Sequence, residues 1–568
     1  MTTSFSSFNR EEMITSIENL SFDLLVIGGG ITGAGIALDA ATRGMKTVLL
    51  EMQDFAAGTS SRSTKLIHGG LRYLKQGELR MVSEVGKERA IVYENGPHVT
   101  TPEWMLLPIY KNGSLGKWST SIGLMVYDYL AGVKRRERRK ILSKEETLKL
   151  VPLLRKDGLL GSGYYIEYRT DDARLTIEVI KEAVRQGATA LNYMQVEDFI
   201  YQSGRLIGVK LLDGLSGERY QVFGEKIVNA TGPWVDLLQA KAGTQNGKKL
   251  RLTKGIHLVF DRKTFPLSQA IYFDTPDKRM MFAIPRGKRT YVGTTDTHYQ
   301  GDIANPSMTR NDRKYVLDAI RFQFPTLNID ESHVVSSWAG LRPLIHDEGK
   351  QPSDISRKDE VWISDSGLIT IAGGKLTGYR KMAEKVVDLV AQSLVEEGYP
   401  QFHACRTKYL PISGGDVGGS TGFPHYIEAK IEQGLRIGLT AEQAKRLIRL
   451  YGSNIDRLYA FASEYKEEFD LPFDLFVSLL YSCREEMVMK PTDFFIRRTG
   501  ALYFNLEWVQ QWKGPVIDFM EKKLKWTVEQ KQGYTQELEK QLYNAVMPLD
   551  ESSLFDILDK NLFNGGNQ

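Results

Sequence analysis

The stretch from Asp23 to Glu51 constrains the fold more than any other part of the chain. It reads DLLVIGGGITGAGIALDAATRGMKTVLLE, an apolar run, a glycine turn, a helix-forming segment and a second apolar run. Gly28, Gly30 and Gly33 take the G-x-G-x-x-G positions, where missing side chains permit a tight turn and close approach of a pyrophosphate. The pattern predicts a β-α-β unit that binds a dinucleotide, with the free N–H groups of its helix directed at the phosphates.

Glu51 ends the second apolar run, close to the position about 20 residues on where an acidic residue takes the ribose hydroxyls. A carboxylate at this position would repel a 2′-phosphate. FAD and NAD share the fingerprint, and a flavoenzyme that exchanges hydride with bound NAD(P)H commonly carries a second one. We find no second G-x-G-x-x-G, because the glycines of Ser413–Gly422 lack a flanking strand and helix and are interpreted as a linker.

Length and composition limit the class of protein. A chain of 568 residues exceeds the roughly 250 to 300 residues of a single core, so we expect two or three domains. The 42% hydrophobic and 25% charged content is globular, and a net charge of +4 is no footprint for nucleic acid. Cys405 and Cys483 form no CxxC pattern, and the eight histidines show no metal-binding spacing. We therefore expect no metal and a reducing, cytoplasmic location.

Export and membrane insertion do not fit the sequence. The first residues, MTTSFSSFNREEMITSIENLS, lack the basic start and apolar core of a signal peptide. No stretch approaches the roughly 20 apolar residues of a spanning helix. The composition thus favours a protein that stays in the cytoplasm.

The middle of the chain continues an α/β pattern. Residues 171–187 have an acidic start, apolar spacing of three and four, and a glycine stop, which predict a helix. Strand-like segments follow at 190–196, 205–212 and 219–224. The next segment ends on Asn229, Ala230, Thr231 and Gly232, small residues that either let the backbone approach a ligand or form a plain turn at a strand end.

Several further motifs carry a resemblance to a known family. They are SSRSTKLIHGGLRYL (60–74), NATGPW (229–234), KGIHLVF (254–260), VGTTDTHY (292–299), WAGLRPL (338–344) and IAGGKLTGYRK (371–381). With the glycine fingerprint they resemble the FAD-dependent oxidoreductases of the D-amino-acid oxidase superfamily. Within it, they are similar to the FAD-dependent glycerol-3-phosphate dehydrogenases. The match runs from about Asp23 to Ala383, with a weaker echo in DFFIRRTGALY (493–503).

The resemblance implies a fold and a reaction. The fold is an α/β FAD-binding domain of the Rossmann type, like glutathione reductase and D-amino-acid oxidase, with an antiparallel substrate cap and an all-α C-terminal domain. The expected segments are 20–75, 150–250 and 336–388 for the FAD-binding domain, 76–149 and 251–335 for the cap, and 389–568 for the helical domain. The reaction is oxidation of sn-glycerol 3-phosphate to dihydroxyacetone phosphate, with hydride passing to FAD and electrons to a membrane quinone.

The same resemblance assigns substrate and catalytic residues. It implies substrate binding by Arg72, Tyr73, Arg342, Arg357 and Lys375, with Arg342 and Lys375 also catalytic. Guanidinium forks suit a dianionic phosphate because they offer paired donors at fixed geometry, although each cation alone is as easily a solvated surface charge. We expect His257 to accept the hydroxyl proton because imidazole titrates near the working pH; the alternative is a satisfied strand histidine.

A larger set of residues is expected to hold FAD. Its members are Gly28, Gly29, Gly30, Thr32, Gly33, Glu51, Thr59, Ser60, Ser61, Leu66, Ile67, His68, Gly70, Ala230, Gly232, Gly374, Lys375, Leu376 and Thr377. Around His68 we expect backbone contact with the flavin rather than a catalytic base.

Transfer to quinone would require contact with a bilayer. The best candidate is Trp118–Lys140, an aromatic and aliphatic stretch that runs into six basic residues and suits an anionic membrane surface. The alternative is an ordinary helix whose basic end complements its dipole. A peripheral location on the inner face of the cell membrane and a homodimer are the corresponding expectations.

Two other functions fit the same residues. A glycerophosphate oxidase would use the same site and pass electrons to oxygen. A non-catalytic flavin-binding sensor would bind FAD without needing several cations and a histidine around one pocket. The sequence leaves the electron acceptor open.

Overall fold

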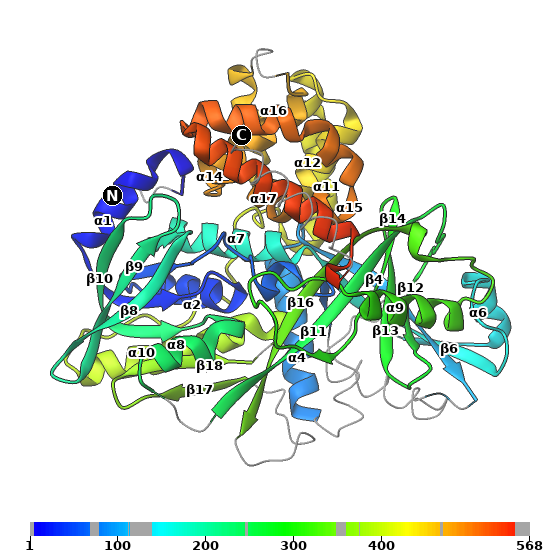
Figure 1. Ribbon diagram of the computed structural model, residues 1–568, viewed down its shortest axis with the longest axis horizontal. Coiled ribbons are helices and arrows are strands. Elements are labelled where there is room, and N and C mark those ends of the chain that lie inside the picture. The colour runs from blue at the N-terminus through cyan, green and yellow to red at the C-terminus, as the bar shows by residue number, and fades with distance from the viewer. Residues whose placement is uncertain are drawn as a thin grey trace, which may run out of the picture.

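The computed structural model describes residues 5–68, 79–111, 113, 139–244, 248–347, 359–373, 375–465 and 470–550. Two large sheets lie side by side, and a group of helices from the C-terminal part of the chain packs above both (Figure 1). The candidate site lies where segments from both sheets meet.

The first sheet contains the predicted β-α-β unit. Its strand order is β17-β18-β10-β1-β2-β7, with β8 and β9 continuing from β10. The strands are β1 (Ser21–Ile27), β2 (Thr47–Leu50), β7 (Thr189–Leu191), β8 (Met194–Gln202), β9 (Arg205–Asp213), β10 (Arg219–Asn229), β17 (Glu360–Ile363) and β18 (Leu368–Ala372). The four central strands β18, β10, β1 and β2 run parallel, so their carboxyl ends share one edge of the sheet.

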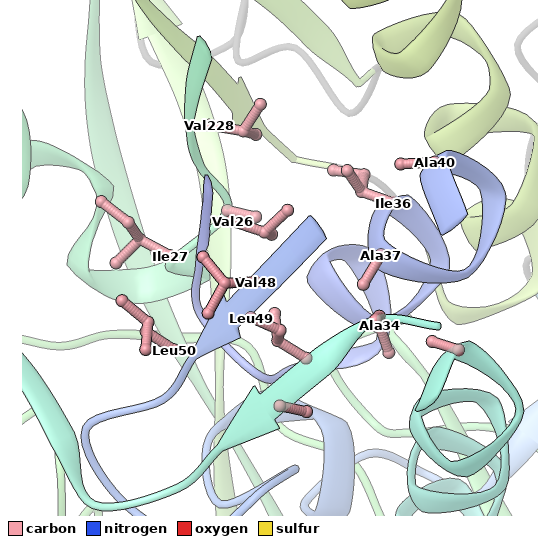
Figure 2. Packing of buried hydrophobic residues seen from close by; sticks show 14 of the residues in the cluster. Val26, Ile27, Ala34, Ile36, Ala37, Ala40, Val48, Leu49, Leu50 and Val228 are labelled. Atoms are coloured by element: carbon pink, nitrogen blue, oxygen red, sulfur yellow. The ribbon is translucent and has the colours of Figure 1, made fainter. Parts of the chain in front are cut away.

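Three helices cover this sheet, namely α2 (Ile31–Thr42), α7 (Asp172–Arg185) and α10 (Tyr379–Glu396). Figure 2 shows Val26 and Leu49 of the strands facing α2. The small side chains of Ala34 and Ala37 on that helix let it approach the sheet closely. This packing fixes where the helix starts relative to the strand ends.

The second sheet is mainly antiparallel. Its order is β15-β11-β14-β13-β12-β4-β6-β3, with β16 paired to β11 and β5 to β6. The strands are β3 (Leu66–Ile67), β4 (Thr100–Tyr110), β5 (Lys140–Leu142), β6 (Leu159–Thr170), β11 (Lys248–Asp261), β12 (Ala270–Asp274), β13 (Met280–Arg286), β14 (Arg289–Gly293), β15 (Thr297–His298) and β16 (Val334–Asp347). Helix α6 (Lys144–Leu150) lies between β5 and β6 in the chain, and α9 (Arg310–Gln323) lies between β15 and β16.

The sheets do not follow the predicted domain segments everywhere. Strands β3, β6 and β16 fall in segments assigned to FAD binding, yet all three pair within the second sheet. The physical reason is long-range pairing: β16 pairs with β11 from Asp347 to Val334, and β6 pairs with β4 over its length. Local sequence patterns identify a strand but not its partner.

The helical domain follows the glycine-rich segment. Its helices are α11 (Gly419–Arg436), α12 (Ala441–Tyr451), α13 (Ile455–Ala460), α14 (Phe473–Glu485), the π-helix η11 (Asp493–Arg498), α15 (Ala501–Phe504), α16 (Leu506–Leu524) and α17 (Val528–Val546). The helix α11 starts before the predicted end of the linker, directly after Gly418, whose φ of 76° breaks the preceding turn. The all-α prediction is confirmed.

The remaining elements are short or connect the others. They are η1 (Ser7–Asn9), α1 (Arg10–Glu18), η2 (Thr59–Ser61), α4 (Leu79–Asn95), η4 (Gly232–Trp234), α8 (Val235–Lys241), η5 (Glu331–His333), η7 (Leu376–Gly378), η8 (Gly452–Asn454) and η9 (Phe461–Glu464). One buried apolar cluster joins Met105 and Trp338 of the second sheet to Phe476 and Phe519 of the helices. The helical domain therefore shares a core with the rest of the molecule.

Candidate functional site

The glycine turn lies at the carboxyl edge of the first sheet. Gly28 has a φ of 110°, and a Cβ there would lie 2.6 Å from the carbonyl oxygen of Ala230 on the neighbouring strand end. A Cβ at Gly33 would lie 1.9 Å from the oxygen of Gly28. The helix α2 starts at Ile31 with Gly30 as its N-cap and no capping side chain from that residue. The turn itself thus adds no side chain at the helix N-terminus, where a pyrophosphate can approach.

Glu51 stands at the end of β2 and faces this turn. Its carboxylate accepts hydrogen bonds from the N–H groups of Gly29, at 2.6 Å, and Gln53, at 2.8 Å. Burial raises the pKa of Glu51. Each carboxylate oxygen has a further lone pair, so the group keeps the capacity to accept a ribose hydroxyl.

The segment η2 continues the wall of the site. The hydroxyl of Ser60 accepts a hydrogen bond of 2.9 Å from the N–H of Ile31, and the hydroxyl of Thr59 donates to Leu341 O at 2.7 Å. Within the part of the chain that the structure describes, the buried hydroxyl of Ser61 has no hydrogen-bond partner. An unsatisfied buried hydroxyl favours a ligand that supplies the missing bond.

Three predicted residues meet at the other end of the site. His68 follows β3, Arg342 lies on β16, and Lys375 precedes η7. Burial, together with the positive charges of Lys375 and Arg342, lowers the pKa of His68 to about 4. The hydroxyl of Thr377 donates to the backbone oxygen of His68 at 3.3 Å. Segments far apart in the sequence thus place a neutral imidazole among cations.

Arg342 is held by residues 294–296, which follow β14. Its Nη1 donates to Thr295 O at 3.2 Å and lies 3.4 Å from the carboxylate of Asp296. Its Nη2 donates to the hydroxyl of Thr294 at 3.2 Å. A Cβ at Gly255 would lie 2.3 Å from that hydroxyl, so glycine is needed opposite it on β11. The guanidinium remains 38% exposed and can receive an anion.

His257 lies deeper, on β11. Its ring stacks on Trp338 at 4.6 Å, and its Nε2 lies 3.1 Å from the hydroxyl of Thr64. Burial lowers the pKa of His257 well below its ordinary value, with Arg342 and Lys65 adding to the effect. The residue is only 1% exposed. Among the described residues, its buried Nδ1 has no hydrogen-bond partner, so the ring is not a fully satisfied strand histidine, and its catalytic role stays a prediction.

Some predicted residues lie outside the described part of the chain. These are Gly70, Arg72, Tyr73, Arg357, Gly374 and Trp118–Arg138 of the membrane candidate. Conversely, sequence reasoning missed the buried Asp54, Arg497 and Arg498 close to the glycine turn. The only signal for the two arginines was the weak family echo in DFFIRRTGALY.

The residues present fit FAD. A Cβ at Gly28 or Gly33 would clash with the backbone that forms the turn, and Ser61 leaves a hydroxyl to be bonded. The carboxylate of Glu51 lies at the turn, and the cations Lys375 and Arg342 lie near His68. This arrangement fits a dinucleotide laid across the carboxyl edge of parallel strands.

Comparison with known families agrees with this geometry. A family model described as FAD dependent oxidoreductase matches residues 23–380, and one described as the C-terminal domain of alpha-glycerophosphate oxidase matches residues 405–531. The aerobic glycerol-3-phosphate dehydrogenase of Bacillus subtilis (strain 168) is 59% identical over 550 residues, which cover 96% of this chain and 99% of that protein. The protein of the same name from Staphylococcus haemolyticus is 56% identical, covering 94% and 96%.

Solved structures point the same way. The glycerol-3-phosphate dehydrogenase from Bacillus halodurans complexed with FAD has a TM-score of 0.84 and 50% identity, covering 96% of this chain and 99% of that one. The L-alpha-glycerophosphate oxidase from Mycoplasma pneumoniae with FAD bound, at 17% identity and a TM-score of 0.54, covers 65% of this chain and 95% of its own, and shares the fold. The predicted resemblance is confirmed, and the chain belongs to the family of FAD-dependent oxidoreductases.

Proposed function

We propose that the chain oxidises sn-glycerol 3-phosphate to dihydroxyacetone phosphate with FAD as its cofactor. The observation that carries the proposal is the meeting of Arg342 and Lys375 around His68, beside the dinucleotide cradle. Paired cations suit a phosphate dianion, and relatives more than half identical carry the name aerobic glycerol-3-phosphate dehydrogenase.

The chemistry divides between cofactor and protein. Bound FAD supplies the acceptor for the hydride that leaves C2 of the substrate. Arg342 and Lys375 bind the phosphate and thereby orient the C2 hydroxyl, with Arg342 fixed by its bonds to Thr294 and Thr295. A neutral side chain then takes the hydroxyl proton.

Two histidines are candidates for that proton. We retain His257 as the proposed acceptor, and the partly buried His68 between the cations is a second candidate that its position favours. Single His→Gln variants separate them, because loss of the acceptor slows flavin reduction far more than it weakens substrate binding. The rate of flavin reduction in stopped flow identifies the residue whose loss removes the chemistry.

The reaction itself has a direct test. Under anaerobic conditions, glycerol 3-phosphate should bleach the yellow flavin of the purified protein, whereas glycerol and inorganic phosphate should not. A flavin that stays yellow would contradict the proposal and leave a flavin-binding sensor or another substrate.

For the electron acceptor we propose a membrane quinone. An anaerobic assay with an added quinone should support turnover, and turnover in air without quinone should release little peroxide. Rapid stoichiometric peroxide release would instead identify a glycerophosphate oxidase.

Use of quinone implies contact with a bilayer from the cytoplasmic side. Among the described residues, none of the helices is long and apolar enough to cross a membrane. We propose peripheral binding through Trp118–Lys140 as a homodimer. Neutralising Lys134, Arg135, Arg136, Arg138, Arg139 and Lys140 together should abolish co-sedimentation with anionic liposomes, and unchanged co-sedimentation would exclude this segment.

A further inference from the structure

The loop between β2 and η2 is tied to the glycine turn. The N–H of Ala56 donates to Gly29 O at 3.0 Å, and Glu51 bonds the N–H of Gly29. A Cβ at Gly29 would lie 2.7 Å from the ring of Phe55 and 2.8 Å from the Cβ of Glu51. The position of this loop, residues 51–57, therefore determines the positions of the glycine turn and of the Glu51 carboxylate.

Two arginines of the helical domain hold the loop by Asp54. Arg498 is bidentate, with Nη1 at 2.7 Å and Nη2 at 2.9 Å from the two carboxylate oxygens. Arg497 donates to the same carboxylate through Nε. Asp54 is 1% exposed and Arg498 fully buried, so these charges have left water completely. A bidentate guanidinium–carboxylate pair fixes the relative position of the two groups better than a single hydrogen bond does.

The local helix geometry allows both arginines to reach one carboxylate. They end the π-helix η11, a rare form that is frequently found at functional sites. Asp493 at its start accepts from Arg497 Nη2 and from the hydroxyl of Tyr193, each at 2.6 Å. The N–H of Tyr193 donates to Gln53 O at 2.9 Å, which gives the helix a second connection to the same loop.

Charge also links Arg497 to the ribose carboxylate. Burial raises the pKa of Glu51, and the positive charge of Arg497 opposes that rise. Arg497 thus favours the ionised carboxylate, which is the form that accepts hydrogen bonds from ribose hydroxyls.

We propose that Arg497 and Arg498 are positioning residues for FAD, so that the helical domain completes the adenosine end of the cofactor site through Asp54 and the loop 51–57. The inference concerns the cofactor alone and does not depend on which substrate or electron acceptor the enzyme uses.

The test measures FAD binding to the full-length apoprotein by the quenching of FAD fluorescence, and apoprotein stability by circular dichroism. Arg498→Met should raise the Kd for FAD at least about tenfold, because the loop loses its bidentate pair with Arg498. The double variant Asp54→Asn with Arg498→Met removes both charges, so it should recover much of the melting temperature while the Kd stays raised. Arg289→Met removes another buried arginine, one that pairs with the more exposed carboxylates of Asp261 and Glu507; it is the control and should leave the Kd within about twofold.

Either of two results would overturn the proposal. One is a Kd for Arg498→Met within twofold of the parent; the other is a double variant whose Kd recovers together with its melting temperature, which is what a purely structural pair predicts. Should Arg498→Met fail to fold, Arg497→Gln decides, because it keeps the bidentate pair and removes the charge near Glu51. That variant should raise the Kd at least about threefold, and an unchanged Kd would count against positioning.

Discussion

Gly33 shows how a single missing side chain shapes the cofactor turn. It sits inside α2, where alanine would ordinarily be the better helix former. A Cβ at this position would nevertheless lie 1.9 Å from the oxygen of Gly28, a contact that requires the backbone of the turn to move. Glycine to alanine in a helix with free space around the new Cβ stabilises the fold instead. The two positions therefore make a matched pair of variants.

Gly33→Ala should abolish FAD binding, whereas Gly533→Ala should leave it intact. Gly533 lies in α17 with nothing within 4 Å of its added Cβ, so alanine there should stabilise the fold by about 0.5–1 kcal/mol. Flavin content after purification and the free energy of unfolding measure the two effects. Retention of FAD by Gly33→Ala would mean that the helix can shift away from the turn.

The two candidate histidines make a prediction about pH. Burial lowers the pKa of His68 to about 4 and that of His257 well below its usual range, so both are neutral from pH 6 to 8. Protonation of a histidine acceptor would begin only as the pH falls toward these lowered values. The rate of flavin reduction should therefore not fall with a midpoint near pH 6.5. If the parent protein shows such a fall and His68→Gln does not, the low pKa of His68 is contradicted.

At the scale of elements, the end of β14 acts as a holder for Arg342. The hydroxyl of Thr294 and the backbone of Thr295 accept from its guanidinium, and β11 pairs with both β14 and β16, the strand of Arg342. Because the arginine is partly exposed, these bonds fix a direction rather than supply much stability. Their effect should therefore be visible in substrate affinity.

Thr294→Val should raise the KM for glycerol 3-phosphate about three- to tenfold, the equivalent of about 1 kcal/mol for one lost hydrogen bond. Flavin content should stay at the parental level. Thr297→Val is the control from the same segment, because the hydroxyl of Thr297 donates to Lys254 O and not to Arg342. Equal KM values for the two variants would show that Thr294 does not orient the guanidinium.

At the scale of the whole molecule, buried charges join the helical domain to the first sheet. Asp54 pairs with Arg497 and Arg498. Glu178 of α7 pairs with Lys181 and Arg174. Arg174 also pairs with Glu486, which follows α14. The neighbouring cations lower the pKa values of Asp54 and Glu178 below their usual range, although both carboxylates are buried. Acid should loosen this interface first.

The pKa of Asp54 is about 2 in the folded protein: burial alone would raise it, and the charges of Arg498 and Arg497 lower it below the ordinary 3.8. Its stabilisation is therefore present above pH 3.8 and is lost as the pH falls toward 2. Between these values, the free energy of unfolding should fall less steeply with pH for Asp54→Asn than for the parent. Urea titrations at several pH values measure the slope, with the exposed Asp456→Asn as control; identical slopes would contradict the assignment.

The sequence by itself determined the local parts of this protein. The β-α-β unit from Asp23, the carboxylate at Glu51 and the helix within residues 171–187 follow from spacing and glycine placement, which act over a few residues. Motifs of the same kind identified the family, and that identification is confirmed.

The tertiary structure alone decided which distant segments meet. Arg497 and Asp54 lie 443 positions apart, and no local pattern reports such a contact. Strands β6 and β16 joined the second sheet rather than the first, and His257 became a buried neighbour of Trp338. Pairing partners and burial depend on how whole elements pack, because backbone hydrogen bonds and apolar area are satisfied between segments rather than within one.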